Sequence, residues 1–196
     1  MSTGRRSPLL EVLAEADAAV DALTAATGLA CPTGCGHCCA HHQPHATVAD
    51  LAPMADAEVV VGTAEARLAA LLAAGDDAPC VYFAAGRLPG GCTAYALRPL
   101  ICRLFGFSAV RDKHGQPELA ACHVHKRERP AAVARAVAHV GAGGPVAVMA
   151  DLQAQADALD PDSARVQHPI NRALRLALER ALLRAAYADA DTPPRP

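Results

Sequence analysis

Apolar residues recur every three or four positions over most of the chain, which is the pattern of amphipathic helices. The N-terminal pattern predicts helices over residues 8–28, 47–52 and 63–74, each starting at Ser, Thr or Pro and ending before Gly or Pro. After residue 130 the pattern predicts further helices, the last of them over residues 169–187. Most of the chain is therefore expected to be α-helical.

A different pattern lies in the middle of the chain. Residues 80–83 and 92–95 are short β-type runs, separated by a loop rich in glycine and proline. A second pair of runs, residues 107–110 and 119–124, flanks a turn. The sequence thus predicts a mostly α fold with a small β-hairpin region.

The length of 196 residues favours one domain. We expect it to span residues 1–187, with a cysteine-cluster metal-binding core at 31–122 and a helical extension at 130–187. Residues 188–196 end in Pro-Pro-Arg-Pro and are predicted to be a disordered tail.

Composition makes the expected core unusual. Hydrophobic residues account for 52% of the chain, but aromatic residues account for only 3% and tryptophan is absent. Alanine, which dominates the helical segments, favours helix but buries little apolar area per residue. Metal cross-links would offset the weakness of such a core.

Charge and hydropathy exclude several classes of function. A net charge of −2 argues against nucleic-acid binding, which usually needs a basic excess. No apolar stretch is long enough to span a membrane. Arg5-Arg6 comes before Leu9-Leu10, but Glu11 and Glu15 interrupt what would be the uncharged part of an export signal. We therefore expect a cytoplasmic protein, in which cysteines are more often metal ligands than disulfides.

Four of the eight cysteines lie within the segment Cys31-Pro32-Thr33-Gly34-Cys35-Gly36-His37-Cys38-Cys39, here called the knuckle. Its proline and glycines let the backbone direct several sulfurs to one point, which predicts metal binding. Adjacent cysteines project in different directions in most conformations, so Cys38 and Cys39 are expected to serve two metals or two atoms of one cluster. Eight thiols suffice for two four-thiolate sites or for one larger cluster.

The knuckle is followed by Cys80, by the block Cys92-x2-Tyr95-x2-Arg98-Pro99-x2-Cys102-Arg103, and by Cys122. Over about residues 31–122 this arrangement resembles the CxxCxxCC cysteine-cluster family, whose domain is described as zinc- or iron-chelating. The resemblance implies an iron–sulfur cluster, such as 4Fe-4S, or Zn²⁺. It also implies that the metal ligands are Cys31, Cys35, Cys38, Cys39, Cys80, Cys92, Cys102 and Cys122.

Other polar residues in these blocks are candidate supporting groups. Arg98 and Arg103 can donate hydrogen bonds to sulfurs and offset thiolate charge, or form surface ion pairs instead. Tyr95 can hydrogen-bond a thiolate or serve as packing. Histidines beside the cysteines could each complete a site, although eight thiols already satisfy two four-coordinate sites. These histidines are His37, His41, His42, His45, His123 and His125.

The predicted function is metal binding through cysteine thiolates, with an iron–sulfur cluster or iron in a structural or redox role. A zinc module that stabilises a protein-interaction surface is the alternative, with the C-terminal helices contacting a partner. A third possibility is a redox or methyl-transfer enzyme, because a similar cysteine block occurs in flagellin lysine N-methylases, which are longer proteins. Cys35-x2-Cys38 also has the spacing of a thiol-redox motif, but a βαβ pattern does not accompany it.

Overall fold

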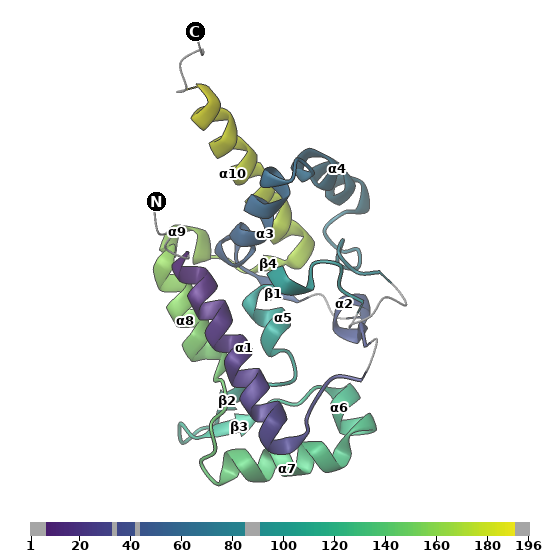
Figure 1. Ribbon diagram of the computed structural model, residues 1–196, viewed down its shortest axis with the longest axis vertical. Coiled ribbons are helices and arrows are strands. Elements are labelled where there is room, and N and C mark those ends of the chain that lie inside the picture. Colours follow the sequence, from purple (N-terminus) through teal and green to yellow (C-terminus); the bar gives the residue numbers. More distant parts are fainter. Residues whose placement is uncertain (1–6, 33–34, 42–43, 85–90, 191–196) are drawn as a thin grey trace.

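A computed structural model describes residues 7–32, 35–41, 44–84 and 91–190 (Figure 1). The described chain is mostly helical, which confirms the predicted fold class. Its helices are α1 (Pro8–Thr27), α2 (His37–His41), α3 (Val48–Val60), α4 (Ala64–Ala74), α5 (Leu100–Leu104), α6 (His123–Glu128), α7 (Pro130–Gly141), α8 (Met149–Leu159), α9 (Pro161–Ala164) and α10 (Ile170–Ala190), with a 3₁₀ turn at Tyr95–Leu97.

The described residues also form two small antiparallel sheets of two strands each. One pairs β2 (Ala109–Arg111) with β3 (Pro117–Leu119), which is the hairpin expected around the central turn. The other pairs β1 (His45–Ala46) with β4 (His168–Pro169), two segments that are far apart in the sequence.

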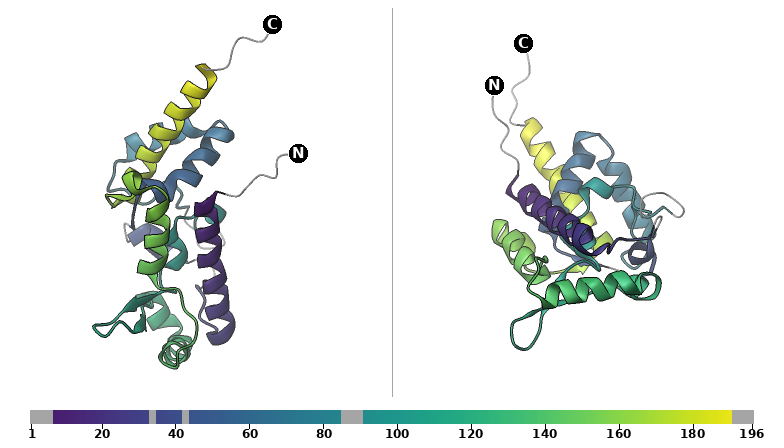
Figure 2. Two further views of the ribbon diagram at one scale, coloured as in Figure 1. Left: turned by 90° about the vertical axis from the view of Figure 1, so that its left-hand side faces the viewer. Right: turned by 60° about the horizontal axis from the view of Figure 1, so that its bottom comes forward.

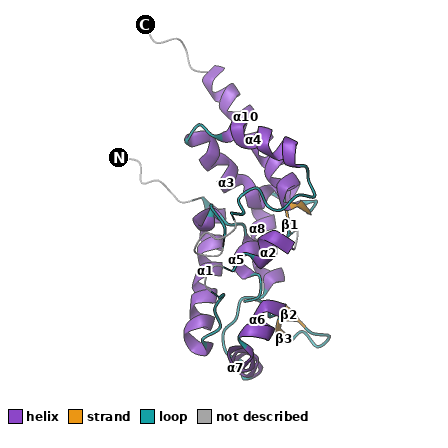
Figure 3. Cartoon of the chain, turned by 90° about the vertical axis from the view of Figure 1, so that its right-hand side faces the viewer, coloured by secondary structure: helices purple, strands orange, loops and turns teal. Residues whose placement is uncertain are grey.

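The helices fall into an upper and a lower half in Figure 1. Helices α3, α4 and α10 make the upper half, and α6, α7 and the β2–β3 hairpin make the lower half (Figures 1 and 2). Helices α1, α5 and α8 run between them, and α2 lies at the side of the molecule between the two halves (Figure 3). The segments that carry cysteines therefore meet near the middle.

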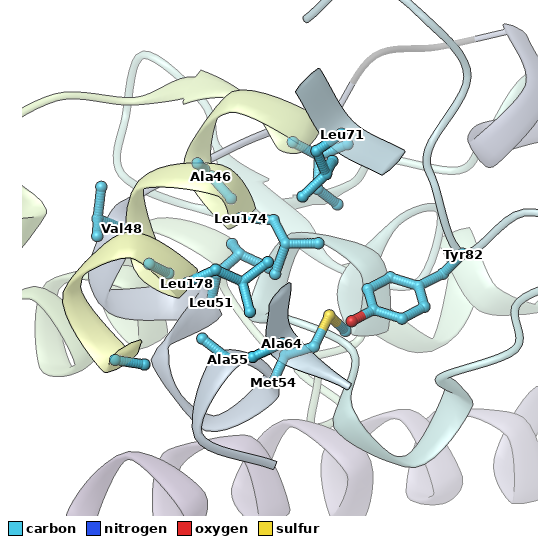
Figure 4. Close-up of a cluster of buried hydrophobic side chains, with 14 residues drawn as sticks. Ala46, Val48, Leu51, Met54, Ala55, Ala64, Leu71, Tyr82, Leu174 and Leu178 are labelled. Atoms are coloured by element: carbon cyan, nitrogen blue, oxygen red, sulfur yellow. The ribbon is translucent and has the colours of Figure 1, made fainter. Parts of the chain in front are cut away.

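Each half has its own hydrophobic cluster. The upper cluster joins Leu51 and Met54 of α3 to Leu174 and Leu178 of α10, with Tyr82 at its edge (Figure 4). The lower cluster joins the end of α1 to α7, through Leu23, Leu29, Phe107, Ala132 and Ala136. A third cluster holds α1, α5 and α8 together, through Leu13, Leu100, Leu104 and Leu152 among others.

The end of α1 follows the prediction and fixes the start of the knuckle. Gly28 adopts a left-handed conformation with φ of 70°, and its N–H donates to the Thr24 carbonyl at 2.8 Å. This is the conformation that glycine adopts most readily at a helix end. Leu29 follows in the lower cluster and is fully buried, so the chain enters the knuckle from an anchored residue.

Helix α3 is longer than predicted. Thr47 and Asp50 form a capping box at the predicted start, but the helix continues through Pro53 to Val60. Proline removes one backbone donor from the helix. Burial of Leu51 and Met54 against α10 outweighs this loss, so the prediction of an end before Pro53 was wrong.

The hairpin predicted over residues 80–95 is reduced to one antiparallel bridge between Phe83 and Cys92. Hydrogen bonds join Thr93 N to Tyr82 O at 2.9 Å and Ala84 N to Gly91 O at 2.7 Å. The connecting loop, 85–90, lies outside the described residues. The second run then turns into the 3₁₀ turn instead of continuing as a strand.

Two other expectations concern the chain after Leu119. The prediction of a β-type run over residues 119–124 was wrong, because only Leu119 lies in a strand, β3, and Cys122 caps α6. Helix α10 continues to Ala190, beyond the predicted start of the tail at residue 188, and residues 191–196 lie outside the described chain. Among the described helices, none combines the length and the apolar character that crossing a bilayer requires.

Candidate metal centre

All eight cysteines line one cavity of about 370 Å³. All are free thiols, of which Cys31 is exposed and the other seven are half-buried. The cysteines are spread around the cavity wall. As a result, in the described part of the chain, no three His, Cys, Asp or Glu side chains form a group close enough to hold a metal ion. The fold thus brings together cysteines that span residues 31–122 of the sequence.

The knuckle presents its thiols on two short structural units. Cys35 N donates to Pro32 O at 3.0 Å, and residues 33–34 lie outside the described chain. Gly36 O then accepts from Cys39 N at 3.0 Å and opens α2. Helix α2 carries Cys38 and Cys39, whose sulfurs are 4.0 Å apart. The adjacent thiols therefore lie side by side, closer than expected for side chains that project in different directions.

Cys80 and Cys92 are held together by the short paired segment. Phe83, which bridges to Cys92, donates its N–H to Cys80 O at 2.8 Å. Asn171 of α10 fixes the same segment from behind. Its Oδ1 accepts from Val81 N at 3.0 Å, and its Nδ2 donates to the carbonyls of Ala78 and Pro79 at 3.1 and 3.2 Å.

Glu58 is a second buried polar residue that supports this segment. It acts through Tyr82, which lines the cavity. Tyr82 donates its hydroxyl to Glu58 Oε1 at 2.6 Å, and Arg67 Nε donates to the same oxygen at 3.0 Å. Burial alone would raise the pKa of Glu58, but hydrogen bonds from Thr63, Tyr82 and Arg67 outweigh it and lower the pKa. Glu58 is therefore an ionised anchor for the Tyr82 hydroxyl.

Sequence reasoning missed both Asn171 and Glu58. Each lies outside the cysteine blocks, and each contacts the cavity wall from a helix distant in sequence. In the structure Asn171 and Glu58 are only 2% and 8% exposed. The signal available in the sequence was a polar residue at a position on the apolar side of a helix. Buried polar side chains need hydrogen-bond partners, so such positions indicate contacts with another segment.

The remaining two cysteines lie on α5 and at the start of α6. Cys102 lies on α5, which begins after Pro99. Cys122 caps α6, and its sulfur accepts from His125 N at 3.5 Å. Gly106, with φ of 84°, passes so close that an added Cβ would lie 3.1 Å from Cys122 Cβ.

Arg98 and Tyr95 line the cavity as a stacked pair. The Arg98 guanidinium lies 3.5 Å from the centre of the Tyr95 ring, and its Nη1 donates to Cys102 O at 3.3 Å. Its positive charge lowers the pKa values of Cys31, Cys38 and Cys102, although other causes are larger for each. Arg98 therefore favours thiolate charge in the cavity.

Arg103 also lines the cavity but has its nitrogens directed to oxygen atoms. Nε donates to Arg98 O at 2.7 Å, Nη2 donates to Ala96 O at 2.7 Å, and Nη1 pairs with Asp17 of α1. The side chain is buried. These contacts hold the block Cys92–Cys102 against α1, and they make Arg103 a group that positions Arg98.

The thiols differ in acidity because their surroundings differ. Burial raises the pKa of Cys80 to about 11. Burial also raises the pKa of Cys102. The hydrogen bond from Cys39 lowers the pKa of Cys38 to about 7 and raises that of Cys39 itself. Without a cation, most of these thiols keep their protons at neutral pH.

The neighbouring histidines have varied positions. His37 lines the cavity, and its ring lies 4.3 Å from that of His123, edge to face. His125 is fully buried, with Nδ1 3.3 Å from Gly106 O and its ring against Phe107. His45 lies in β1. The His41 side chain and His42 lie outside the described part of the structure.

The CxxCxxCC family model, described as a "putative zinc- or iron-chelating domain", matches residues 30–142. The chain belongs to this family. The CxxCxxCC match covers all eight cysteines and more than half of the 196 residues, and it extends past Cys122 to include α6 and α7. No curated protein and no solved structure matches the chain.

The donor set of this CxxCxxCC domain fits a soft metal. Thiolate sulfur is the ligand that zinc and iron–sulfur clusters take in sets of four. The cavity wall provides eight such sulfurs with a guanidinium beside them. A bound cation would favour the thiolate forms that burial disfavours in the metal-free chain.

Proposed function

We propose that this chain holds iron, in an iron–sulfur centre, through its eight cysteine thiolates in a reducing cytoplasm. The observation that carries the proposal is the single cavity that all eight cysteines line. Eight thiolates in one cavity carry a large negative charge, and the cationic core of an iron–sulfur cluster offsets part of that charge. Arg98 contributes further positive charge from the wall.

The role of the centre follows from its position between the two halves of the molecule. Cys80 and Cys92 are fixed to α10 through Asn171, and Cys122 begins α6. A metal that binds these segments at once would cross-link the upper and lower halves. Stabilisation of the fold is thus the basic role, and the exposed Cys31 also gives electron donors an approach to the centre.

Elemental analysis of anaerobically purified protein tests the proposal. Iron and acid-labile sulfide in similar amounts, with a coloured protein, are the expected result. Zinc without sulfide would replace the proposal with a structural zinc module, because Zn²⁺ accepts the same four-thiolate sets and is colourless. Protein with neither metal, even after incubation with ferrous iron and sulfide or with zinc under reducing conditions, would overturn metal binding by this cavity.

A further inference from the structure

The eight cysteines do not all belong to the same part of the structure. Cys80, Cys92 and Cys102 pack against the upper hydrophobic cluster, which is built on α3, α4 and α10. These three thiols form the upper wall of the cavity. Their backbone is further fixed by Asn171 and by the Tyr82–Glu58 hydrogen bond.

Cys31 and Cys122 are attached to the lower cluster instead. Cys31 follows Leu29 by two residues, and Leu29 packs in the same cluster as Phe107. Cys122 is three residues before His125, whose ring packs edge to face on Phe107 at 4.9 Å. The contact between the rings of His37 and His123 joins the knuckle to this lower wall.

Backbone contacts keep neighbouring members of each side together. On the lower side, Cys35 N donates to Pro32 O at 3.0 Å, directly after Cys31. On the upper side, Phe83 bridges to Cys92 and donates its N–H to Cys80 O at 2.8 Å.

Helix α2 lies at the boundary. The upper wall supplies three thiols and the lower side supplies Cys31, Cys35 and Cys122, so each set of four needs one thiol from this helix. Consecutive residues of a helix point about 100° apart around its axis, as follows from its 3.6 residues per turn. Their sulfurs are nevertheless only 4.0 Å apart, so two sets that meet here would be direct neighbours.

We propose that the cavity holds two adjacent thiolate centres. Cys31, Cys35 and Cys122 bind the first, Cys80, Cys92 and Cys102 bind the second, and the adjacent Cys38 and Cys39 provide one thiol to each. This division rests on the proposed metal-binding function and adds the ligand set of each centre. The first centre is attached to the lower hydrophobic cluster, and the second is attached to the upper hydrophobic cluster. The pair of adjacent cysteines is then the link between them.

Cobalt titration of the full-length, metal-free protein tests the division, because Co²⁺ bound by thiolates is coloured and takes the tetrahedral geometry of zinc. The wild type should bind about two equivalents, and the variants Cys122→Ser and Cys102→Ser should each keep about one, in a four-thiolate site. The two variants are matched controls, since each removes one thiol from a different set. Loss of all cobalt from both folded variants would indicate one shared centre and overturn the division.

Half-loaded wild-type protein gives a second test that needs no substitution. After addition of one equivalent of Zn²⁺, alkylation and mass spectrometry identify the protected cysteines. We expect protection in whole sets, either the four of the lower centre or the four of the upper centre. Joint protection of Cys38 and Cys39 in half-loaded chains, or of Cys31 with Cys102, would overturn the division. Absence of any Zn²⁺ or Co²⁺ binding would instead contradict metal binding itself.

Discussion

At the scale of single residues, the cavity contains one chemical group in several environments. Burial and nearby thiols raise the pKa of Cys80 to about 11, whereas the hydrogen bond from Cys39 lowers the pKa of Cys38 to about 7. In the metal-free protein, Cys38 therefore ionises near neutral pH, whereas Cys80 keeps its proton. Thiolate, and not thiol, is the nucleophile and the metal ligand. Cys38 is therefore expected to be the most reactive cysteine of the metal-free protein.

This difference predicts the order of alkylation in the metal-free protein. At pH 7, Cys38 is about half ionised and should react with iodoacetamide before the other cysteines. Peptide mass spectrometry after short reaction times measures the order. Cys39→Ala removes the donor and should slow the labelling of Cys38. A first reaction at the exposed Cys31 would show that accessibility, and not acidity, determines reactivity.

The same scale shows what the sequence could identify. The cysteines and Arg98 were found because their spacing follows a recognisable pattern, and all of them line the cavity. Asn171 and Glu58 were not found, because their partners lie in other segments: Val81 is 90 residues from Asn171, and Tyr82 is 24 residues from Glu58. Such contacts depend on the tertiary fold, which the local pattern does not contain.

At the scale of elements, helix α10 has a second function besides packing. It places Asn171 behind the segment that carries Cys80, where one amide satisfies three backbone groups. Removal of such a partner leaves a buried donor unsatisfied, which costs about 1–3 kcal/mol. The C-terminal helix therefore contributes to the shape of the cavity without a ligand of its own.

Asn171→Ala tests this contribution. We expect a free energy of unfolding lower by about 1–3 kcal/mol, and faster loss of bound metal to a chelator. The neighbouring substitution Arg172→Ala is the control, since Arg172 is exposed on the same turn of α10. Chemical denaturation and chelator-exchange rates give the two readouts. Equal metal-loss rates in both variants would show that Asn171 stabilises the helix contact alone.

Element boundaries were predicted well where a local signal determines them. Gly28 ends α1, and the capping box at Thr47 starts α3. The predictions failed where packing outweighed the local signal, as at Pro53, which lies within α3 because that helix packs on α10. The β1–β4 pairing was not predicted, because two strands of two residues each have no periodicity to detect.

At the scale of the whole molecule, the cavity lies where the upper and lower clusters meet. Many core positions are alanine, for example Ala16, Ala136 and Ala173, and alanine provides little apolar area. A metal that binds cysteines from both halves adds cross-links to a core that buries little apolar area per residue. The metal-bound chain should therefore be considerably more stable than the metal-free chain.

Metal removal measures this difference. A metal present at about 1,000 times its dissociation constant stabilises the native state by about 4 kcal/mol. For a chain of this length, that corresponds to a rise in Tm of about 8–16 °C. Thermal unfolding followed by circular dichroism, before and after anaerobic chelation, is the measurement, and re-addition of metal is the control. An unchanged Tm would contradict a structural role of the centre.

The exposure of Cys31 has a further consequence, for the kinetics of metal exchange. Among the eight thiols, Cys31 alone is exposed, while the other seven are half-buried in the wall. An incoming thiol or chelator can therefore replace the ligands of the lower centre one at a time, starting at Cys31. The upper centre lacks such an accessible ligand, so its metal should exchange slowly. It should be the last metal to leave when a chelator or an oxidant attacks the protein.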